Sequence, residues 1–479
     1  MKASQETGLK QINGMCSGVW AIPMDNFSLL ESCLSSFLFF ILQTLPTGAG
    51  LLLVAGTQSG CGKTTVTLAL MQYLRAQGQS VAPFKSGPDF LDPMWHAIAC
   101  DQTSYNLDTH MMGVDACREL VAEKAAGADV CFIEGVMGLF DGISGVGGKG
   151  SSAHLAKTLN ETVLLVVNAK GMSGSIVPLV EGFSTRAKTM GVNITGIIAN
   201  RVGSQNHACI LRKLLLEFDL PPLVAWMQKG APLLSERHLG LVMPGKDALP
   251  DFSPFFHIEK DFTFAPPRRS TSTVREKACT ARLLSKRIAV AKDAACCFIY
   301  LANIEWLQAE GAEVLFFSLL AGEPVPEHAD ALWLPGGYPE LHAKALSKSA
   351  SLHSIRTFIE SGKPTLAECG GMMVLGESLS DQSAQQWPMA GLIPCSFIMQ
   401  DKLAGLGYRR ESGGVCGHEF HHSKREVSDD LQPAFQVNRG DAGIRYKNLR
   451  ASYVHWHFPS QPAIVASWFG VKAGEKDGH

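Results

Sequence analysis

The chain has 479 residues, enough for two or three domains, and 46% of them are hydrophobic, which is ordinary for buried α/β cores. A formal net charge of −2 provides no electrostatic footprint for nucleic acid, so we exclude that class of partner. The thirteen cysteines are scattered and contain no C-x-x-C pair, which argues against a disulfide or zinc framework. We therefore expect buried thiols in a reducing compartment and a cytoplasmic location.

Residues 1–48 do not share the pattern of the rest of the chain, and we interpret them as an N-terminal extension. The apolar segment from Phe27 to Leu45 is interrupted by Glu31 and Gln43, and its unbroken run falls short of the roughly 18 residues that a membrane span needs. No small-residue cleavage site follows a basic region, as a secretory signal would require. We expect no stable membrane insertion.

A glycine-rich loop follows the apolar run from Leu51 to Ala55, and residues 56–65 read GTQSGCGKTT before a helical pattern begins. Glycines let backbone N–H groups approach an anion, and the helix N-terminus adds positive potential. Lys63 can reach the β- and γ-phosphates of a nucleotide, while Thr64 can ligate Mg²⁺. The first glycine stands one residue earlier than in the strict pattern, so this is a variant P-loop. The predicted ATP-binding residues of the loop are Gly56, Ser59, Gly60, Gly62, Lys63, Thr64 and Thr65.

Apolar runs alternate with helix-length segments in this part of the chain, which predicts βαβ units and a mostly parallel sheet. The predicted strands are Leu51–Ala55, Val81–Phe84, Val130–Ile133, Val163–Val167 and Ile194–Ala199. Ligands of such sheets bind at the carboxyl ends of the strands, so the polar residues there are the candidates for a site.

Carboxylates follow the second and third of these strands. We assign Glu134 and Asp89, with Thr64, to the metal, because strand-end carboxylates hold Mg²⁺ in other P-loop enzymes. The candidates for acceptor binding or activation are Lys85, Asp89, Asp92 and Asp141. For Asp92 and Asp141, turn formation alone is the open alternative.

Two asparagine clusters provide weaker signals, because Asn and Asp are common in turns. Asn106–Asp108 and Asn200–Gly203 are both predicted to lie in loops, and we assign Asn200 to the ATP site. Residues 246–285 become rich in Pro, Ser and Arg, which indicates a linker between domains at 49–245 and 286–475.

A second α/β series begins at Arg287 and contains a candidate nucleophile. A strand from Pro364 runs into Glu-Cys-Gly-Gly, and a helix is predicted over Met372–Leu379. A thiol on such a turn lies at a helix N-terminus, and we expect this position to favour the thiolate of Cys369.

The other parts of a nucleophilic site are also present in this half of the chain. Gly336 and Gly337 can donate backbone N–H groups as an oxyanion hole. His455 and His457 are candidate bases for Cys369. We expect these two histidines to face opposite sides of a strand, so that only one meets the thiol.

Ten segments in one order resemble the cobyrinic acid a,c-diamide synthase family, in which an ATP-dependent ligase domain related to dethiobiotin synthetase is fused to a class I glutamine amidotransferase domain. The resemblance covers about Leu51 to Phe469. Its segments are GTQSGCGKTT from Gly56, FKSGPDFLDPMWH from Phe84, YNLD from Tyr105, EGVMGLFDG from Glu134, NRVGS from Asn200, RHLGLVMP from Arg237, PGGYPE from Pro335, AECGG from Ala367, GHEFHHS from Gly417 and SYVHWHF from Ser452.

This resemblance implies a P-loop parallel-sheet domain followed by a flavodoxin-like amidotransferase domain. It makes Cys369 the glutaminase nucleophile and His455 its base. The implied partners are L-glutamine, ATP with Mg²⁺, and a corrinoid tetrapyrrole acid whose a and c acetates are amidated through acyl phosphates, and a homodimer is plausible. The His-x-Glu of ordinary class I triads is His455-Trp456-His457 here, so what orients His455 stays open.

Two alternatives are left by the motifs. The acceptor can be hydrogenobyrinic acid or nickel-sirohydrochlorin, because the motifs do not record the shape of the acceptor pocket. A variant P-loop also occurs in dimeric ATPases that act as assembly or positioning switches, although such proteins lack a domain like that of Cys369.

Overall fold

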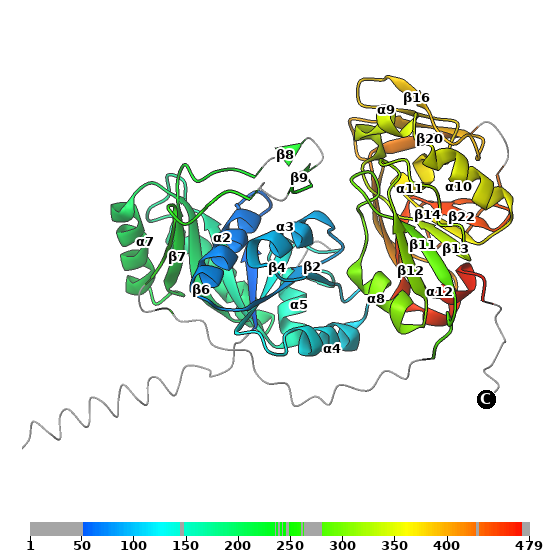
Figure 1. The fold of residues 1–479 in the computed structure, drawn as a ribbon. Coiled ribbons are helices and arrows are strands. Elements are labelled where there is room, and N and C mark those ends of the chain that lie inside the picture. Colours follow the sequence, from blue (N-terminus) through cyan, green and yellow to red (C-terminus); the bar gives the residue numbers. More distant parts are fainter. Residues whose placement is uncertain are drawn as a thin grey trace, which may run out of the picture. The chain divides into compact units, whose positions relative to one another are not determined.

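The computed structural model describes residues 51–471 apart from 144–147, 235, 238–239, 242, 246–248, 260–261, 263–279 and 428–430. The N-terminal extension and most of the expected linker therefore lie outside the described residues. Ala49–His479 forms one compact unit, which contains two largely parallel sheets (Figure 1).

The first sheet has eight strands in the order β10-β7-β6-β5-β1-β4-β2-β3. Its neighbours are parallel except where β10 pairs antiparallel with β7. The strands are β1 Leu51–Gly56, β2 Val81–Ser86, β3 Tyr105–Leu107, β4 Val130–Gly138, β5 Thr162–Asn168, β6 Ile194–Val202, β7 Leu223–Gln228 and β10 Phe256–Ile258, with a separate two-stranded piece formed by β8 Glu236–Arg237 and β9 Gly240–Leu241. The predicted parallel α/β domain is confirmed.

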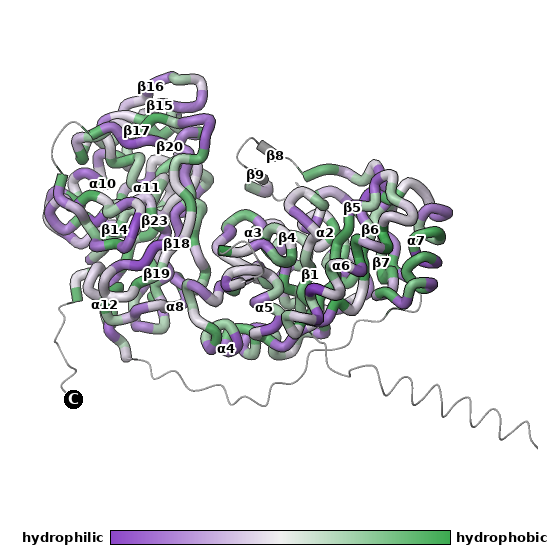
Figure 2. The backbone as a smooth tube through the Cα atoms, turned by 180° about the vertical axis from the view of Figure 1, so that it is seen from behind, coloured by the Kyte–Doolittle hydropathy of each residue, from purple (hydrophilic) through white to green (hydrophobic). Residues whose placement is uncertain are grey.

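Helices cover both faces of this sheet, which explains why its central strands are apolar without alternation. Leu52 and Val54 of β1 share a core with α2 and α3, while Leu51 and Leu53 share the other core with α4 to α7. Strands β1, β5 and β6 are accordingly coloured hydrophobic over much of their length in Figure 2. The helices are α2 Lys63–Ala76, α3 Leu91–Cys100, α4 Val114–Lys124, α5 Ser152–Leu159, α6 Ile176–Thr189 and α7 Gln205–Glu217.

Several polar residues that were expected in loops lie on strands instead. Asn106 belongs to β3 and Asn200 to β6, so both expectations are wrong. The segment expected to link the domains contributes β10 to the sheet edge, where Phe252 and Phe256 are buried. Burial of these aromatic side chains against α2 is a tertiary effect that the local Pro-rich composition does not reveal.

The second sheet has the order β12-β11-β13-β14-β22-β21. If its five parallel strands are counted along the chain, their order is 2-1-3-4-5, which is the flavodoxin-like topology. The strands are β11 Arg287–Ala291, β12 Glu313–Phe317, β13 Ala331–Leu334, β14 Thr365–Glu368, β21 Ile444–Tyr446 and β22 Leu449–Ser452. The helices of this part are α8 Leu301–Ala309, α9 Ala343–Leu346, α10 Ser351–Glu360, α11 Gly370–Met373 and α12 Pro462–Trp468.

Two small sheets complete this domain. One has the order β16-β15-β17-β20 and the other has the order β18-β19-β23. Their strands are β15 Ser378–Ser380, β16 Gln386–Pro388, β17 Cys395–Met399, β18 Gly405–Arg410, β19 Cys416–His421, β20 Ser423–Val427 and β23 Val454–His457.

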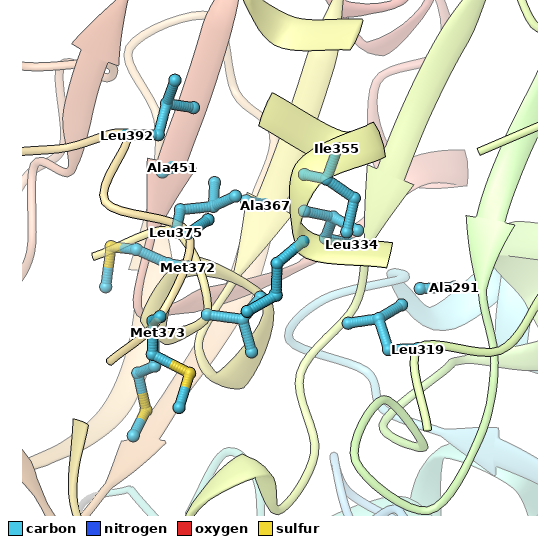
Figure 3. Close-up of a cluster of buried hydrophobic side chains, with 14 of the residues drawn as sticks. Ala291, Leu319, Leu334, Ile355, Ala367, Met372, Met373, Leu375, Leu392 and Ala451 are labelled. Atoms are coloured by element: carbon cyan, nitrogen blue, oxygen red, sulfur yellow. The ribbon is translucent and has the colours of Figure 1, made fainter. Parts of the chain in front are cut away.

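A hydrophobic cluster fixes the segment that follows β14. Figure 3 shows Met372, Met373 and Leu375 together on one side of the cluster, with Leu334 and Ile355 on the other. Met372 and Met373 are less than 4% exposed, so their packing in this cluster holds the turn that precedes them in place. Among the described residues, no helix combines the length and the apolar character that a membrane crossing needs.

Candidate active sites

The glycine loop connects β1 to α2 and has the backbone shape that its glycines allow. Gly60 and Gly62 have φ angles of +74° and +90°, which side-chain-bearing residues rarely adopt. Lys63 begins α2 and donates from Nζ to the Met137 carbonyl oxygen at 3.2 Å. Ser59 and Gly60 at the tip of the loop are exposed, which leaves their backbone accessible to an anion.

Asn200 of β6 supports this loop from behind. Its Nδ2 donates to the Cys61 carbonyl oxygen at 2.9 Å. A Cβ atom at Gly62 would overlap Asn200 Nδ2, so only glycine fits at Gly62. Asn200 is buried, and its Oδ1 accepts from the backbone N–H of Arg201 at 2.8 Å.

Glu134 of β4 is the centre of a buried polar network. Its Oε1 accepts from Thr64 Oγ1 at 2.6 Å and from Lys85 Nζ at 3.1 Å. Its Oε2 lies 2.7 Å from His96 Nε2. Glu134 has no exposed surface, so these partners replace the water that its carboxylate has lost.

Glu134 and Lys85 favour each other's charged forms, whereas burial and the neighbouring Asp89 raise the pKa of Asp92 to about 8. Burial alone would raise the pKa of Glu134, but Lys85 and His96 lower it below its ordinary range. For Lys85, burial opposes the charged form, yet the neighbouring Asp92 and Glu134 raise the pKa overall. The pKa of Lys63 is lowered, first by burial and then by Lys85. An anion bound at the loop would relieve this repulsion between the two lysines.

The other predicted carboxylates have different surroundings. Asp92 in the first turn of α3 pairs with Lys85, so it belongs to the Glu134 network. Asp89 Oδ1 accepts the N–H groups of Leu91 and Asp92 at 2.9 Å each, which caps α3. Asp141 Oδ2 accepts from Gly138 N at 2.9 Å and is exposed. The structure therefore brings Asp92 into the network and gives Asp141 a turn-forming contact.

The oxygen atoms at the loop fit a hard divalent cation. The hydroxyl of Thr64 and the carboxylate of Glu134 are hydrogen-bonded to each other next to the phosphate cradle, and oxygen is the ligand that Mg²⁺ prefers. Asp89 fits this task less well, because its Oδ1 is already used by backbone N–H groups.

Cys369 lies at the sharp turn between β14 and α11. Its φ of 47° and ψ of −110° are unusual for a residue with a side chain, as expected of a nucleophile held on an elbow. The helix that follows is only Gly370–Met373, so the predicted helix over Met372–Leu379 is wrong. Leu379 lies on β15, because the chain turns into a second small sheet at this point.

Two glycines pack closely against this turn. A methyl group at Gly336 would overlap the His455 ring and lie 3.2 Å from Cys369 Cβ. A Cβ at Gly370 would lie 3.0 Å from the backbone nitrogen of Gly337, which places that nitrogen beside the nucleophile turn. Gly336 therefore leaves the space in which the thiol and the imidazole meet.

Strand β23 carries both candidate bases on one face. His455 pairs in register with His418, and His457 with Cys416, while Trp456 between them enters the hydrophobic core. The expectation that the two histidines face opposite sides is wrong, since residues two apart in a strand share a face. The close approach of both residues to Gly336 places the ring of His455 beside Cys369, so His455 is the better candidate base of the two.

Among the described residues, no carboxylate is hydrogen-bonded to the ring of His455. Its Nδ1 is buried and has no hydrogen-bond partner among the described residues. The strand is fixed through its backbone instead, because Glu368 Oε1 accepts from Trp456 N at 2.9 Å. The side chain of Asn303 of α8 also binds this strand, because it donates to Trp456 O and accepts from Phe458 N, each at 2.8 Å.

Burial shifts the pKa values of Cys369 and His455 in the directions that favour their neutral forms. Burial, followed by the nearby Glu340, raises the pKa of Cys369, so the expected thiolate at a helix N-terminus is wrong. Burial lowers the pKa of His455 to about 3, which keeps the imidazole free to accept a proton. Such a pair forms the thiolate only as the proton moves to His455 during attack.

Sequence reasoning assigned no role to His96, Phe90 or Glu368, although each lies within a quoted segment. His96 follows Asp92 by four residues, and on a helix this spacing places both on one face. That spacing was the available signal for His96. The contacts of Phe90 and Glu368 join residues far apart in the chain, so no local pattern indicates them.

Comparison with known proteins agrees with these two sites. Residues 52–221 match the CobQ/CobB/MinD/ParA nucleotide binding domain family, and residues 287–463 match the CobB/CobQ-like glutamine amidotransferase domain family. The chain is 38% identical to the cobyrinate a,c-diamide synthase of Priestia megaterium and 40% identical to that of Herminiimonas arsenicoxydans. These alignments cover 89% and 90% of the chain and 98% of each relative. The chain belongs to the a,c-diamide synthase family.

The family also includes relatives named for a different acceptor. The hydrogenobyrinate a,c-diamide synthase of Stutzerimonas stutzeri is 39% identical, with coverage of 87% of this chain and 97% of the relative. Membership over nearly the whole chain does not favour an ATPase switch, because synthases of this family have a glutaminase domain in addition to the nucleotide domain.

Replacing Gly336 with Ala tests the contact between the thiol and the imidazole. The added methyl group overlaps the His455 ring, so we expect glutaminase kcat to fall at least about a hundredfold, while ammonia-dependent amidation persists. Gly174→Ala is the matched control, because a Cβ there meets no atom within 4 Å. Normal glutaminase activity of Gly336→Ala would contradict the geometry.

Glu368 predicts a pH dependence of stability. Burial raises the pKa of its carboxyl from 4.5 to about 8, so between these values the folded protein holds a proton that the unfolded chain releases. Its stabilising contribution is complete below the lower value and is lost as the pH rises through about 8. The melting temperature of the native protein should therefore fall relative to that of Glu368→Gln from pH 5 to pH 8. Calorimetry that gives parallel curves would contradict this assignment.

Proposed function

We propose that the chain is a glutamine- and ATP-dependent amidoligase that amidates the a and c acetate carboxylates of cobyrinate. The observation that carries the proposal is the presence, in one chain, of a phosphate loop bonded to Glu134 and of Cys369 beside His455. A ligase that makes its own ammonia needs both. The names of the relatives supply the acceptor and agree with this chemistry.

In the glutaminase half, Cys369 gives its proton to His455 as the sulfur attacks the side-chain amide carbon of L-glutamine. The backbone N–H groups of Gly336 and Gly337 stabilise the oxyanion that forms. Protonation of the amide nitrogen releases ammonia and leaves a thioester on Cys369. Water hydrolyses this thioester to glutamate and restores the thiol.

In the ligase half, the loop from Gly56 to Thr65 binds the phosphates of ATP, and Asn200 maintains the shape of the loop. Lys63 neutralises charge on the transferring γ-phosphoryl group. Thr64 and Glu134 are the residues that would hold Mg²⁺, which supplies further charge neutralisation when bound.

The acceptor is expected beside the same network. Lys85 near the end of β2, together with Asp89 and Asp92 after it, orients the carboxylate that takes the phosphoryl group. The carboxylate oxygen attacks the γ-phosphorus with loss of ADP, and ammonia then displaces phosphate from the acyl phosphate to give the amide. Asp141 shapes the turn after β4 at the border of this site.

Two substitutions should separate the two halves. Cys369→Ala should stop glutamine-dependent amidation but leave amidation with ammonium salt, because only the nitrogen source is lost. Lys63→Ala should lower amidation with either nitrogen source at least about a hundredfold, while glutaminase activity survives in part. Both can be measured from glutamate release and amide formation. A Cys369→Ala protein that uses glutamine at the normal rate would refute the two-site proposal.

The identity of the acceptor is tested by a panel of macrocycles. Full-length protein with MgATP and glutamine is given cobyrinate, hydrogenobyrinate or nickel-sirohydrochlorin, and products are identified by mass spectrometry. We expect two amidations of cobyrinate and a lower kcat/KM for the other two acids. Preference for hydrogenobyrinate, as in the name of the Stutzerimonas stutzeri relative, would change the acceptor but not the chemistry. The homodimer and the cytoplasmic location are further predictions, and light scattering tests the first.

A further inference from the structure

Phe90 connects the ligase half to the glutaminase half through its side chain. It directly precedes α3 and lies between Asp89 and Asp92. We call residues 85–92, which contain the proposed acceptor-binding side chains, the acceptor segment. Its ring is stacked on Tyr300 with centroids 4.4 Å apart and on Phe298 at 5.0 Å. The same ring lies 5.0 Å from the imidazole of His455. Phe90 is thus a residue of the first domain that touches the proposed base of the second.

The two aromatic partners of Phe90 are themselves bonded to the segments around it. Tyr300 donates from its hydroxyl to the carbonyl oxygen of Pro88 at 3.2 Å, and Pro88 belongs to the acceptor segment. Phe298 N donates to the Gly336 carbonyl oxygen at 2.9 Å, and Gly336 lines the space beside the thiol. The aromatic cluster of Phe90, Phe298 and Tyr300 therefore joins the acceptor segment to His455 and to Gly336.

His455 depends on packing for its orientation. In the part of the chain that the structure describes, its Nδ1 has no hydrogen-bond partner and no carboxylate is hydrogen-bonded to the ring. The rings recorded against His455 are those of Phe90, tilted by 53°, and Phe298, at 5.8 Å and 61°. Aromatic contacts of this kind contribute about 0.5–1.5 kcal/mol each and favour particular ring angles. Removal of Phe90 therefore removes much of what restrains the imidazole.

The position of Phe90 is set by the ligase site. Asp89, which precedes Phe90, accepts from the backbone N–H groups of Leu91 and Asp92, which follow it. Asp92 pairs with Lys85. Lys85 in turn bonds Glu134 beside the phosphate loop. A substrate that reorganises these charged groups changes the backbone that carries the Phe90 ring.

We propose that Phe90 is a positioning residue for the glutaminase base: its ring holds His455 toward Cys369 and makes the base responsive to occupancy of the acceptor segment. The inference rests on the proposed roles of Cys369 and His455. Ammonia is then made efficiently only when the ligase half is arranged to use it, because misplacement of a reacting group by about 1 Å costs up to about a hundredfold in rate.

The test compares Phe90→Ala with Phe90→Tyr in the full-length protein. Glutaminase kcat and KM are measured with and without MgATP and cobyrinate. We expect Phe90→Ala to lose about tenfold in glutaminase kcat, with KM for glutamine changed less than twofold, and to lose its stimulation by the ligase substrates. Phe90→Tyr keeps the ring and should retain both properties.

Glu305→Gln provides a matched control at another contact between the two halves. Glu305 accepts from Tyr105 Oη at 2.6 Å and from Lys124 Nζ at 3.1 Å. Its substitution therefore weakens the contact between the two halves of the chain and leaves Phe90, Phe298 and Tyr300 unchanged. We expect Glu305→Gln to keep the native glutaminase kcat and its stimulation. An equal loss in Glu305→Gln would overturn the inference, because association alone would then explain the effect.

The failure of the inference can be distinguished from failure of the proposed function. If Cys369→Ala abolishes glutaminase activity while Phe90→Ala keeps native kcat and stimulation, only the role of Phe90 is refuted. If Cys369→Ala keeps glutaminase activity, the underlying assignment of the nucleophile is refuted. Circular dichroism and ammonia-dependent amidation verify that Phe90→Ala is folded, so a loss confined to glutamine chemistry supports the proposal.

Discussion

The ligase half depends on a carboxylate that is buried without any access to water. A charge in that position is tolerated only when it is paired and hydrogen-bonded, and Glu134 meets this condition with Thr64, Lys85 and His96. The partners come from α2, β2 and α3, so satisfying one charge fixes three elements around β4. The carboxylate of Glu134 therefore fixes the positions of both the phosphate loop and the acceptor segment.

The glutaminase half uses the opposite electrostatic arrangement. Burial favours the neutral forms of Cys369 and His455, and the buried Glu368 accepts from backbone N–H and indole N–H rather than from the imidazole. Charge therefore appears at this site only during the reaction. One consequence is that the resting thiol is protected from unwanted chemistry, because the reactive form of a cysteine is the thiolate.

Local patterns were sufficient to predict both domains and the two turns that carry Lys63 and Cys369. A glycine loop before a helix and a strand that runs into Cys-Gly-Gly have geometric requirements that are readable over ten residues. The ionisation of Cys369 was not predictable in this way, because it depends on burial by distant segments and on a helix of only four residues. The partners of Glu134 likewise lie 38 to 70 residues away in sequence.

The antiparallel edge strand β10 has a practical meaning for anyone who wishes to express the nucleotide domain alone. A fragment that stops at Gly245 would leave the edge of β7 unpaired and would remove Phe252 and Phe256 from the core beside α2. It would also break the bonds between Gln72 of α2 and the backbone of residues 250 and 252. Exposed strand edges promote aggregation, so an autonomous fragment must extend past Ile258 to keep β7 paired with β10.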